Sequence, residues 1–92
     1  MIEETLRGGQ FKFETKPGLF SKDEIDLGSR LLIENIEVSE SDNVLDLGCG
    51  YGAIGLVAAS LAKRGKVWMV DIDIRAVKLS KSNAVLNNIS NV

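Results

Sequence analysis

The sequence predicts an α/β fold with a parallel sheet, and two observations carry this prediction. Short apolar runs at 44–47 and 67–70 have the length and the continuous hydrophobicity of buried parallel strands. Segments with helical patterning follow these runs at 53–62 and 74–87. A strand–helix–strand–helix order at this spacing is typical of a βαβ unit, in which both strands are parallel and the crossover is right-handed.

Residues 1–42 are predicted to form an N-terminal extension, and residues 43–92 the βαβα half. Alternation of apolar and polar side chains indicates a half-buried strand, and a Pro-Gly pair indicates a turn. The expected elements of the extension are a loose leader over 1–9, a strand over 10–15, a turn at 17–18 and a helix over 22–35.

The predicted start of that helix rests on its capping signals. Ser21 and Glu24 have the spacing of a capping box, in which each side chain bonds to the backbone N–H of the other residue. Phe20 and Ile25 flank them at the spacing of a hydrophobic staple. The expected apolar stripe of the helix consists of Ile25, Leu32 and Ile36.

The composition excludes several classes of chemistry. The 92 residues include no His and a single Cys, so a Ser-His-Asp triad, a Cys-His pair, a His-ligated metal and an internal disulfide are impossible within this chain. No apolar run approaches the ~18 residues that span a bilayer. The first ten residues also lack the apolar core of a signal peptide. We therefore expect a cytoplasmic protein without metal or membrane partners.

The charge is unevenly distributed along the chain. Residues 1–46 carry 5 basic and 11 acidic groups, whereas residues 47–92 carry 6 basic and 2 acidic groups, for a total of −2. No basic patch dominates either half. This chain alone is therefore a poor electrostatic match to a phosphate backbone.

A glycine cluster lies between the first predicted parallel strand and the helix after it. Gly50, Gly52 and Gly55 satisfy the dinucleotide fingerprint, so NAD is one candidate ligand. Asp46, two residues before Gly48, argues against NAD, because its carboxylate would repel a pyrophosphate. A ligand with an ammonium and a sulfonium group is favoured instead, and S-adenosylmethionine (SAM) is such a ligand.

A second acidic position follows the next strand. Asp71 comes 23 residues after Gly48, about where a βαβ nucleotide site places the carboxylate that accepts hydrogen bonds from ribose hydroxyls. Asp73 is an alternative for this role and could equally cap the next helix. Cys49 is expected to be a small buried filler, since no base is available to activate its thiol.

Three segments together resemble one protein family. Val44-Leu-Asp-Leu-Gly-Cys-Gly-Tyr-Gly-Ala-Ile-Gly55 resembles motif I of class I SAM-dependent methyltransferases, which have a Rossmann-like fold. Thr15 to Ser21 and Ile25 to Leu32 resemble the opening segment of the methyltransferase small domain family. Asp71-Ile-Asp73 with Ala76, Asn83 and Asn87 resembles that family's next segment. The family includes ribosomal RNA guanine-N2 methyltransferases and archaeal predicted RNA methylases, and the resemblance spans about residues 11–92.

The resemblance implies roles for individual residues. Asp71 would hold the ribose of SAM, Ile72 would flank the adenine, and Phe20, in the turn before the first helix, would fold over the cofactor or serve only as the staple. Asn83 would hydrogen-bond the backbone within the core. The residues expected to line the methionine side of SAM are Asp46, Gly48, Gly50 and Gly52, and Cys49 and Tyr51 between these glycines are also counted as cofactor-binding residues.

One family motif is absent from these 92 residues. The family carries an Asn-Pro-Pro-aromatic motif that holds the target amino nitrogen, whereas the only proline here is Pro17. We therefore expect no catalytic residue in this chain, which resembles the SAM-binding half of a methyltransferase truncated before that motif. Open edges of a two-stranded parallel sheet predict an oligomer or a complementing chain.

The expected activity of the complete protein is methylation of an exocyclic base nitrogen in RNA, such as a guanine of ribosomal RNA. Two alternatives stay open. One is a non-catalytic fragment that binds SAM or a partner, and the other, disfavoured by Asp46, is a Rossmann fragment that binds NAD.

Overall fold

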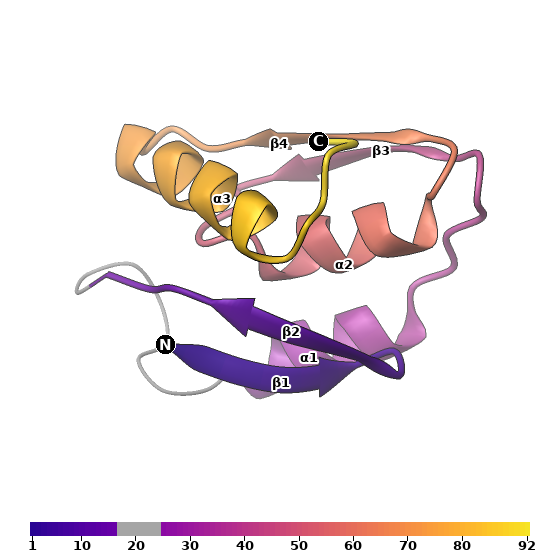
Figure 1. Cartoon of the computed structure of the whole chain (residues 1–92), viewed down its shortest axis with the longest axis horizontal. Helices are drawn as coiled ribbons and strands as arrows, with labels where there is room; N and C mark the ends of the chain where they lie inside the picture. The colour runs from indigo at the N-terminus through magenta and orange to yellow at the C-terminus, as the bar shows by residue number, and fades with distance from the viewer. Residues whose placement is uncertain (17–24) are drawn as a thin grey trace.

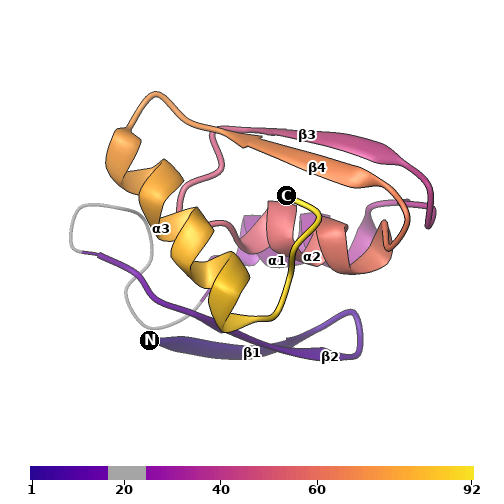
Figure 2. The ribbon, with the colours of Figure 1, turned by 45° about the horizontal axis from the view of Figure 1, so that its top comes forward.

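The computed structural model describes residues 1–16 and 25–92, which form two small sheets with helices between them (Figures 1 and 2). In both views the helices lie on the same side of the β3–β4 sheet, and the β1–β2 hairpin lies at the far end of the molecule from that sheet, so that α2 and α3 are between the two sheets. The elements in chain order are β1 (Ile2–Leu6), β2 (Gly9–Phe13), α1 (Leu27–Asn35), β3 (Asn43–Leu47), α2 (Ala53–Leu61), β4 (Lys66–Val70) and α3 (Ile74–Leu86).

The parallel pair of strands confirms the predicted α/β class. β3 and β4 pair in parallel, with the register running from Asn43 opposite Lys66 to Leu47 opposite Val70. α2 connects them and packs on their inner face (Figure 2). After α3 the chain returns to this sheet, where the Val67 N–H donates to the carbonyl of Asn91 at 2.8 Å.

The N-terminal hairpin was not foreseen, and the prediction of a loose leader over residues 1–9 is wrong. Ile2 and Leu6 are fully buried and belong to β1, which pairs antiparallel with β2. Arg7 and Gly8 both have positive φ values, 53° and 77°, as a two-residue hairpin turn of type I′ requires. Glu4 shares the inner face and pairs with Arg30, so an acidic residue interrupts the apolar alternation that would have indicated a strand.

Helix α1 begins later than the predicted Lys22. Ile25 and Asp26 precede the helix, which begins at Leu27 with Asp26 as its N-cap. The Asp26 side chain accepts a hydrogen bond from the Ser29 N–H at 3.1 Å. The predicted turn at 17–18, Phe20 and the Ser21–Glu24 capping box lie outside the described residues.

The other end of α1 is held by the hairpin turn. The guanidinium of Arg7 donates to the carbonyl oxygens of Ile33, Glu34 and Ile36 at 3.4, 3.1 and 3.0 Å. α1 has no basic residue in its own last turn, so Arg7 supplies the cation that suits a helix C-terminus. This contact ties the N-terminal hairpin to the segment that leads into β3.

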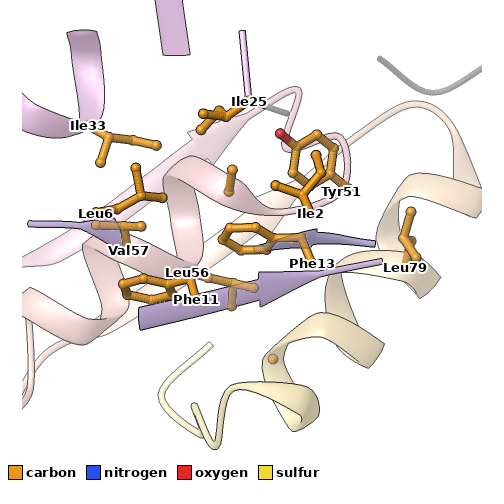
Figure 3. Packing of buried hydrophobic residues seen from close by; sticks show 12 residues of the cluster. Ile2, Leu6, Phe11, Phe13, Ile25, Ile33, Tyr51, Leu56, Val57 and Leu79 are labelled. Atoms are coloured by element: carbon orange, nitrogen blue, oxygen red, sulfur yellow. The ribbon is translucent and has the colours of Figure 1, made fainter. Parts of the chain in front are cut away.

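The hydrophobic core lies between the hairpin and the helices (Figure 3). Phe13 contacts Tyr51 edge-on, with ring centroids 5.6 Å apart, so the hairpin packs directly on the segment after β3. The predicted stripe of α1 is wrong at Leu32, which is 48% exposed, because Ile33 is the residue that the helix buries. The members of this core labelled in Figure 3 are Ile2, Leu6, Phe11, Phe13, Ile25, Ile33, Tyr51, Leu56, Val57 and Leu79.

The outer face of the parallel sheet carries large apolar side chains. In the described part of the chain no helix covers this face (Figures 1 and 2). None of the helices in residues 1–16 and 25–92 is long and apolar enough to cross a membrane. We call this surface the outer sheet face, and its exposed residues are Leu45, Leu47, Trp68 and Val70.

Candidate cofactor-binding site

The glycine loop that joins β3 to α2 has a backbone that only glycine adopts readily. Gly48, Gly50 and Gly52 have φ values of 73°, 57° and 103°, in the region that side chains disfavour. The N–H groups of Gly48 and Cys49 donate to the carbonyl of Val70 at 2.7 and 3.0 Å. These bonds fasten the loop to the carboxyl end of β4, the edge at which open α/β sheets bind ligands.

Asp71 lies at the rim of this loop, as its spacing predicts. Its Oδ2 accepts from the Gly50 N–H and its Oδ1 from the Asp73 N–H, both at 2.9 Å. These two bonds, the one from Asp73 foremost, hold the pKa of Asp71 below its usual range. The bond from Gly50 was not predicted, because it joins residues 21 positions apart. The bond from the Asp73 N–H is an Asx-turn, in which an Asp side chain accepts from the backbone two residues further on. The role of Asp71 toward a ribose remains a prediction.

The alternative for the ribose, Asp73, has a different place. It is the N-cap of α3, and its side chain accepts from the Arg75 N–H at 2.9 Å. Its carboxylate also pairs with the Arg75 guanidinium at 2.7 Å. Capping therefore accounts for Asp73, and Asp71 is the acidic residue that faces the loop.

Asp46 lies beneath the glycine loop, and one of its carboxylate oxygens lacks a hydrogen-bond donor in the described part of the chain. Its Oδ2 is buried and has no hydrogen-bond partner among the described residues. A Cβ on Gly55 would lie 2.8 Å from this oxygen, so only glycine leaves room for the carboxylate. Burial raises the pKa of Asp46, and the negative charge of Asp71 raises it further. The backbone amide of Gly55 is close enough to offset part of this rise, although it does not form a hydrogen bond with Oδ2.

The space beside Asp46 is an open groove of about 660 Å³, within the range of small-molecule sites. It runs between α1 and the edge of β3, and we call it the β3 groove. Gly48 faces open space, since nothing lies within 4 Å of the position of a Cβ there. The residues through which the glycine loop and α2 line the groove are Gly48, Ile54, Gly55 and Ala58.

These features fit a cationic ligand such as SAM. A buried acceptor without a donor costs free energy, which a ligand N–H or hydroxyl would recover. The exposed backbone at Gly48 lets such a ligand approach closely. The fit concerns only the loop and its two carboxylates, so the contacts of SAM with Asp46, Gly48, Gly50 and Gly52 remain predictions.

The side chains of Cys49 and Tyr51 point into the protein. Both residues are buried, so they can face a ligand only through their backbone. Burial raises the pKa of the Cys49 thiol, which lies 3.4 Å from the Ser80 hydroxyl. That hydroxyl donates to the Gly50 carbonyl at 2.8 Å. Ser80 thus supports the loop from α3, a role that its sequence position alone did not indicate.

Asn83 has the structural place that was expected. It is fully buried, and its amide nitrogen donates to the carbonyls of Tyr51 and Glu14 at 2.7 and 3.0 Å. Its Oδ1 accepts from the Glu14 N–H at 2.8 Å. One side chain therefore joins the glycine loop, α3 and the segment after β2.

The remaining predicted site residues are not brought to the loop by any described contact. Ile72 is fully exposed next to Asp71, as an apolar residue that flanks a ligand base would be, and its role stays a prediction. Phe20 is outside the described residues. Among residues 1–16 and 25–92 no group of three or more acidic or Cys side chains could hold a metal ion.

Comparison with known proteins agrees with the resemblance of the motifs. Residues 10–92 match the family model described as "Methyltransferase small domain". The chain is 50% identical over 88 residues to the "Uncharacterized protein YbxB" of Bacillus subtilis, and covers 44% of that protein.

Two further relatives are named as ribosomal RNA methyltransferases. The chain is 32% identical over 81 residues to the "Ribosomal RNA small subunit methyltransferase C" of Erwinia tasmaniensis, of which it covers 24%. It is 35% identical over 81 residues to the "Ribosomal RNA large subunit methyltransferase G" of Shewanella denitrificans, of which it covers 21%. The 92 residues thus span less than half the length of these relatives. Because the family model covers almost the whole chain, the protein belongs to the methyltransferase small domain family.

Proposed function

We propose that these residues are the SAM-binding part of a methyltransferase that acts on RNA. The observation that carries the proposal is the buried Asp46 oxygen without a partner, beneath a glycine loop whose backbone is open at Gly48. A neutral or anionic ligand would leave the Asp46 charge uncompensated, whereas the ammonium and sulfonium of SAM would not. Asp71, at the rim of the loop, would hold the ribose, and Ile72 would flank the adenine.

The proposed substrate is an exocyclic base nitrogen, such as that of a guanine in ribosomal RNA. Two relatives are named as ribosomal RNA methyltransferases, which supports this substrate class and, with it, a place in the cytoplasm. When bound, SAM would supply an electrophilic methyl group on its sulfonium. The residues of this chain would bind and orient the cofactor, a proximity effect that needs no covalent intermediate.

We also propose the division into an extension over 1–42 and a SAM-binding half over 43–92.

Calorimetric titration tests the proposed cofactor. We expect the chain to bind SAM and S-adenosylhomocysteine and to show no heat of binding with NAD. Binding of NAD without SAM would refute the proposal and favour the dinucleotide alternative. A transfer assay with tritiated SAM and ribosomal RNA, on the protein that contains these residues, then separates an enzyme from a non-catalytic SAM-binding module.

We propose in addition that the 92-residue chain self-associates through the outer sheet face. Leu47 is 75% and Trp68 50% exposed there, and a contiguous apolar face of a sheet is a common association surface. Sedimentation velocity should therefore show dimers or larger species, and Trp68→Lys should shift them toward monomer. A monodisperse monomer with a cooperative melt would contradict this proposal.

A further inference from the structure

A small hollow joins helix α1 to the glycine loop. Asp26 and Ser29 form one wall, and the loop from Gly48 to Tyr51 forms the other. Its volume of about 70 Å³ corresponds to roughly two water molecules, so it admits a small polar group but no nucleoside. The hollow shares Gly48 and Ile54 with the β3 groove, so one ligand can occupy both spaces. We call it the Asp26 hollow.

The charge of this hollow comes from one residue. Among the described residues that line it, Asp26 is the only Asp, Glu, Lys or Arg. The Ser29 hydroxyl and N–H donate to its two oxygens at 2.8 and 3.1 Å, and they lower the pKa of Asp26. The carboxylate is therefore held in one orientation and stays charged. Each oxygen keeps a second lone pair for a further donor.

A second observation points to a cation in the β3 groove that adjoins this hollow. Asp46 lines the β3 groove together with Gly48, and its buried Oδ2 has no hydrogen-bond donor among the described residues. Two carboxylates thus flank the exposed glycine backbone, one from α1 and one from β3, and no described cationic side chain neutralises either of them. A ligand with two positive groups would complement both carboxylates, and SAM has this pattern of charge.

We propose that Asp26 binds the ammonium group at the amino-acid end of SAM, with Ser29 holding its carboxylate in place. This assignment rests on the proposed function and adds a contact from the N-terminal extension to the site. It explains why the cap of α1 faces the glycine loop. Asp26 would then fix which end of the cofactor enters the hollow, and the sulfonium would lie toward Asp46.

The test compares two ligands and two variants that replace a carboxylate by its amide. 5′-Methylthioadenosine keeps the nucleoside and sulfur of SAM but lacks the amino-acid end. Asp26→Asn removes the charge and preserves the helix cap, because asparagine caps as well as aspartate. Glu34→Gln is the matched control, since Glu34 also accepts from a backbone N–H, that of Arg7 at 2.9 Å, but lies at the opposite end of α1.

We expect Asp26→Asn to weaken SAM binding about 10-fold, the usual value of a charge-assisted hydrogen bond, and to leave methylthioadenosine affinity unchanged. Glu34→Gln should change neither affinity. If Asp26→Asn binds SAM as tightly as the unaltered chain, or loses both ligands equally, the assignment of Asp26 is overturned while the proposed function stands. If the unaltered chain binds no SAM at all, the proposed function itself fails.

Discussion

Asp46→Asn is expected to weaken SAM binding by about 10- to 100-fold, because the variant removes the charge that attracts the cationic cofactor. Asparagine keeps the shape of the side chain beneath Gly55 and removes only the charge. Calorimetry on the variant and on the Glu34→Gln control measures the loss. Unchanged affinity in Asp46→Asn would show that the carboxylate beneath the loop does not bind the ligand.

The same variant should stabilise the protein without its ligand. Burial raises the pKa of Asp46 above that of the unfolded chain. The protonated form is therefore favoured by folding, and the stability it contributes is lost as pH rises through the raised pKa. Asp46→Asn should thus raise the free energy of unfolding at neutral pH. SAM binding should have the opposite dependence and weaken as pH falls below that pKa. A destabilised Asp46→Asn chain would contradict the account of this carboxylate.

Asn83→Ala is expected to destabilise the fold by about 3 kcal/mol, because it leaves the buried carbonyl of Tyr51 and the part-buried backbone groups of Glu14 without this partner. Denaturant unfolding of the two chains measures this difference. SAM binding should also weaken, because the Tyr51 carbonyl is no longer held and the glycine loop loses its link to α3.

Asn87→Ala is the matched control for this prediction. Asn87 makes the same pair of bonds to the backbone of Lys12, at 2.9 and 2.6 Å, but on the exposed side of the hairpin. Water can replace those bonds, so removal of the Asn87 side chain should lower the free energy of unfolding by about 1 kcal/mol or less. Equal losses of unfolding free energy in the two variants would mean that the burial of Asn83 does not strengthen the effect of its hydrogen bonds.

The parallel half of the fold could be predicted because its signals are local. Apolar runs of strand length, separated by a helical segment, suffice for β3, α2 and β4. In the hairpin, β2 overlaps the predicted strand over 10–15. β1 was missed because Glu4 lies on its inner face, and the residue that neutralises Glu4, Arg30, is 26 positions away. Tertiary pairing of this kind leaves no trace in the periodicity of a short strand.

The candidate site shows the same division. The glycines and the spacing of Asp71 are visible in the sequence, because a turn with positive φ and a strand end impose residue types. Ser80 and Asp26 are not visible in this way. They approach the loop only because α3 and α1 pack around it, and their own sequence contexts indicate an ordinary helix position and an ordinary cap.

The most direct test of the central claim is amide chemical-shift mapping of the ¹⁵N-labelled chain with S-adenosylhomocysteine. The account predicts saturable shifts centred on the amides of Gly48 to Gly52 and of Asp71 to Asp73, with NAD causing none. Shifts confined to the hairpin or to the outer sheet face, with an unaffected glycine loop, would contradict it.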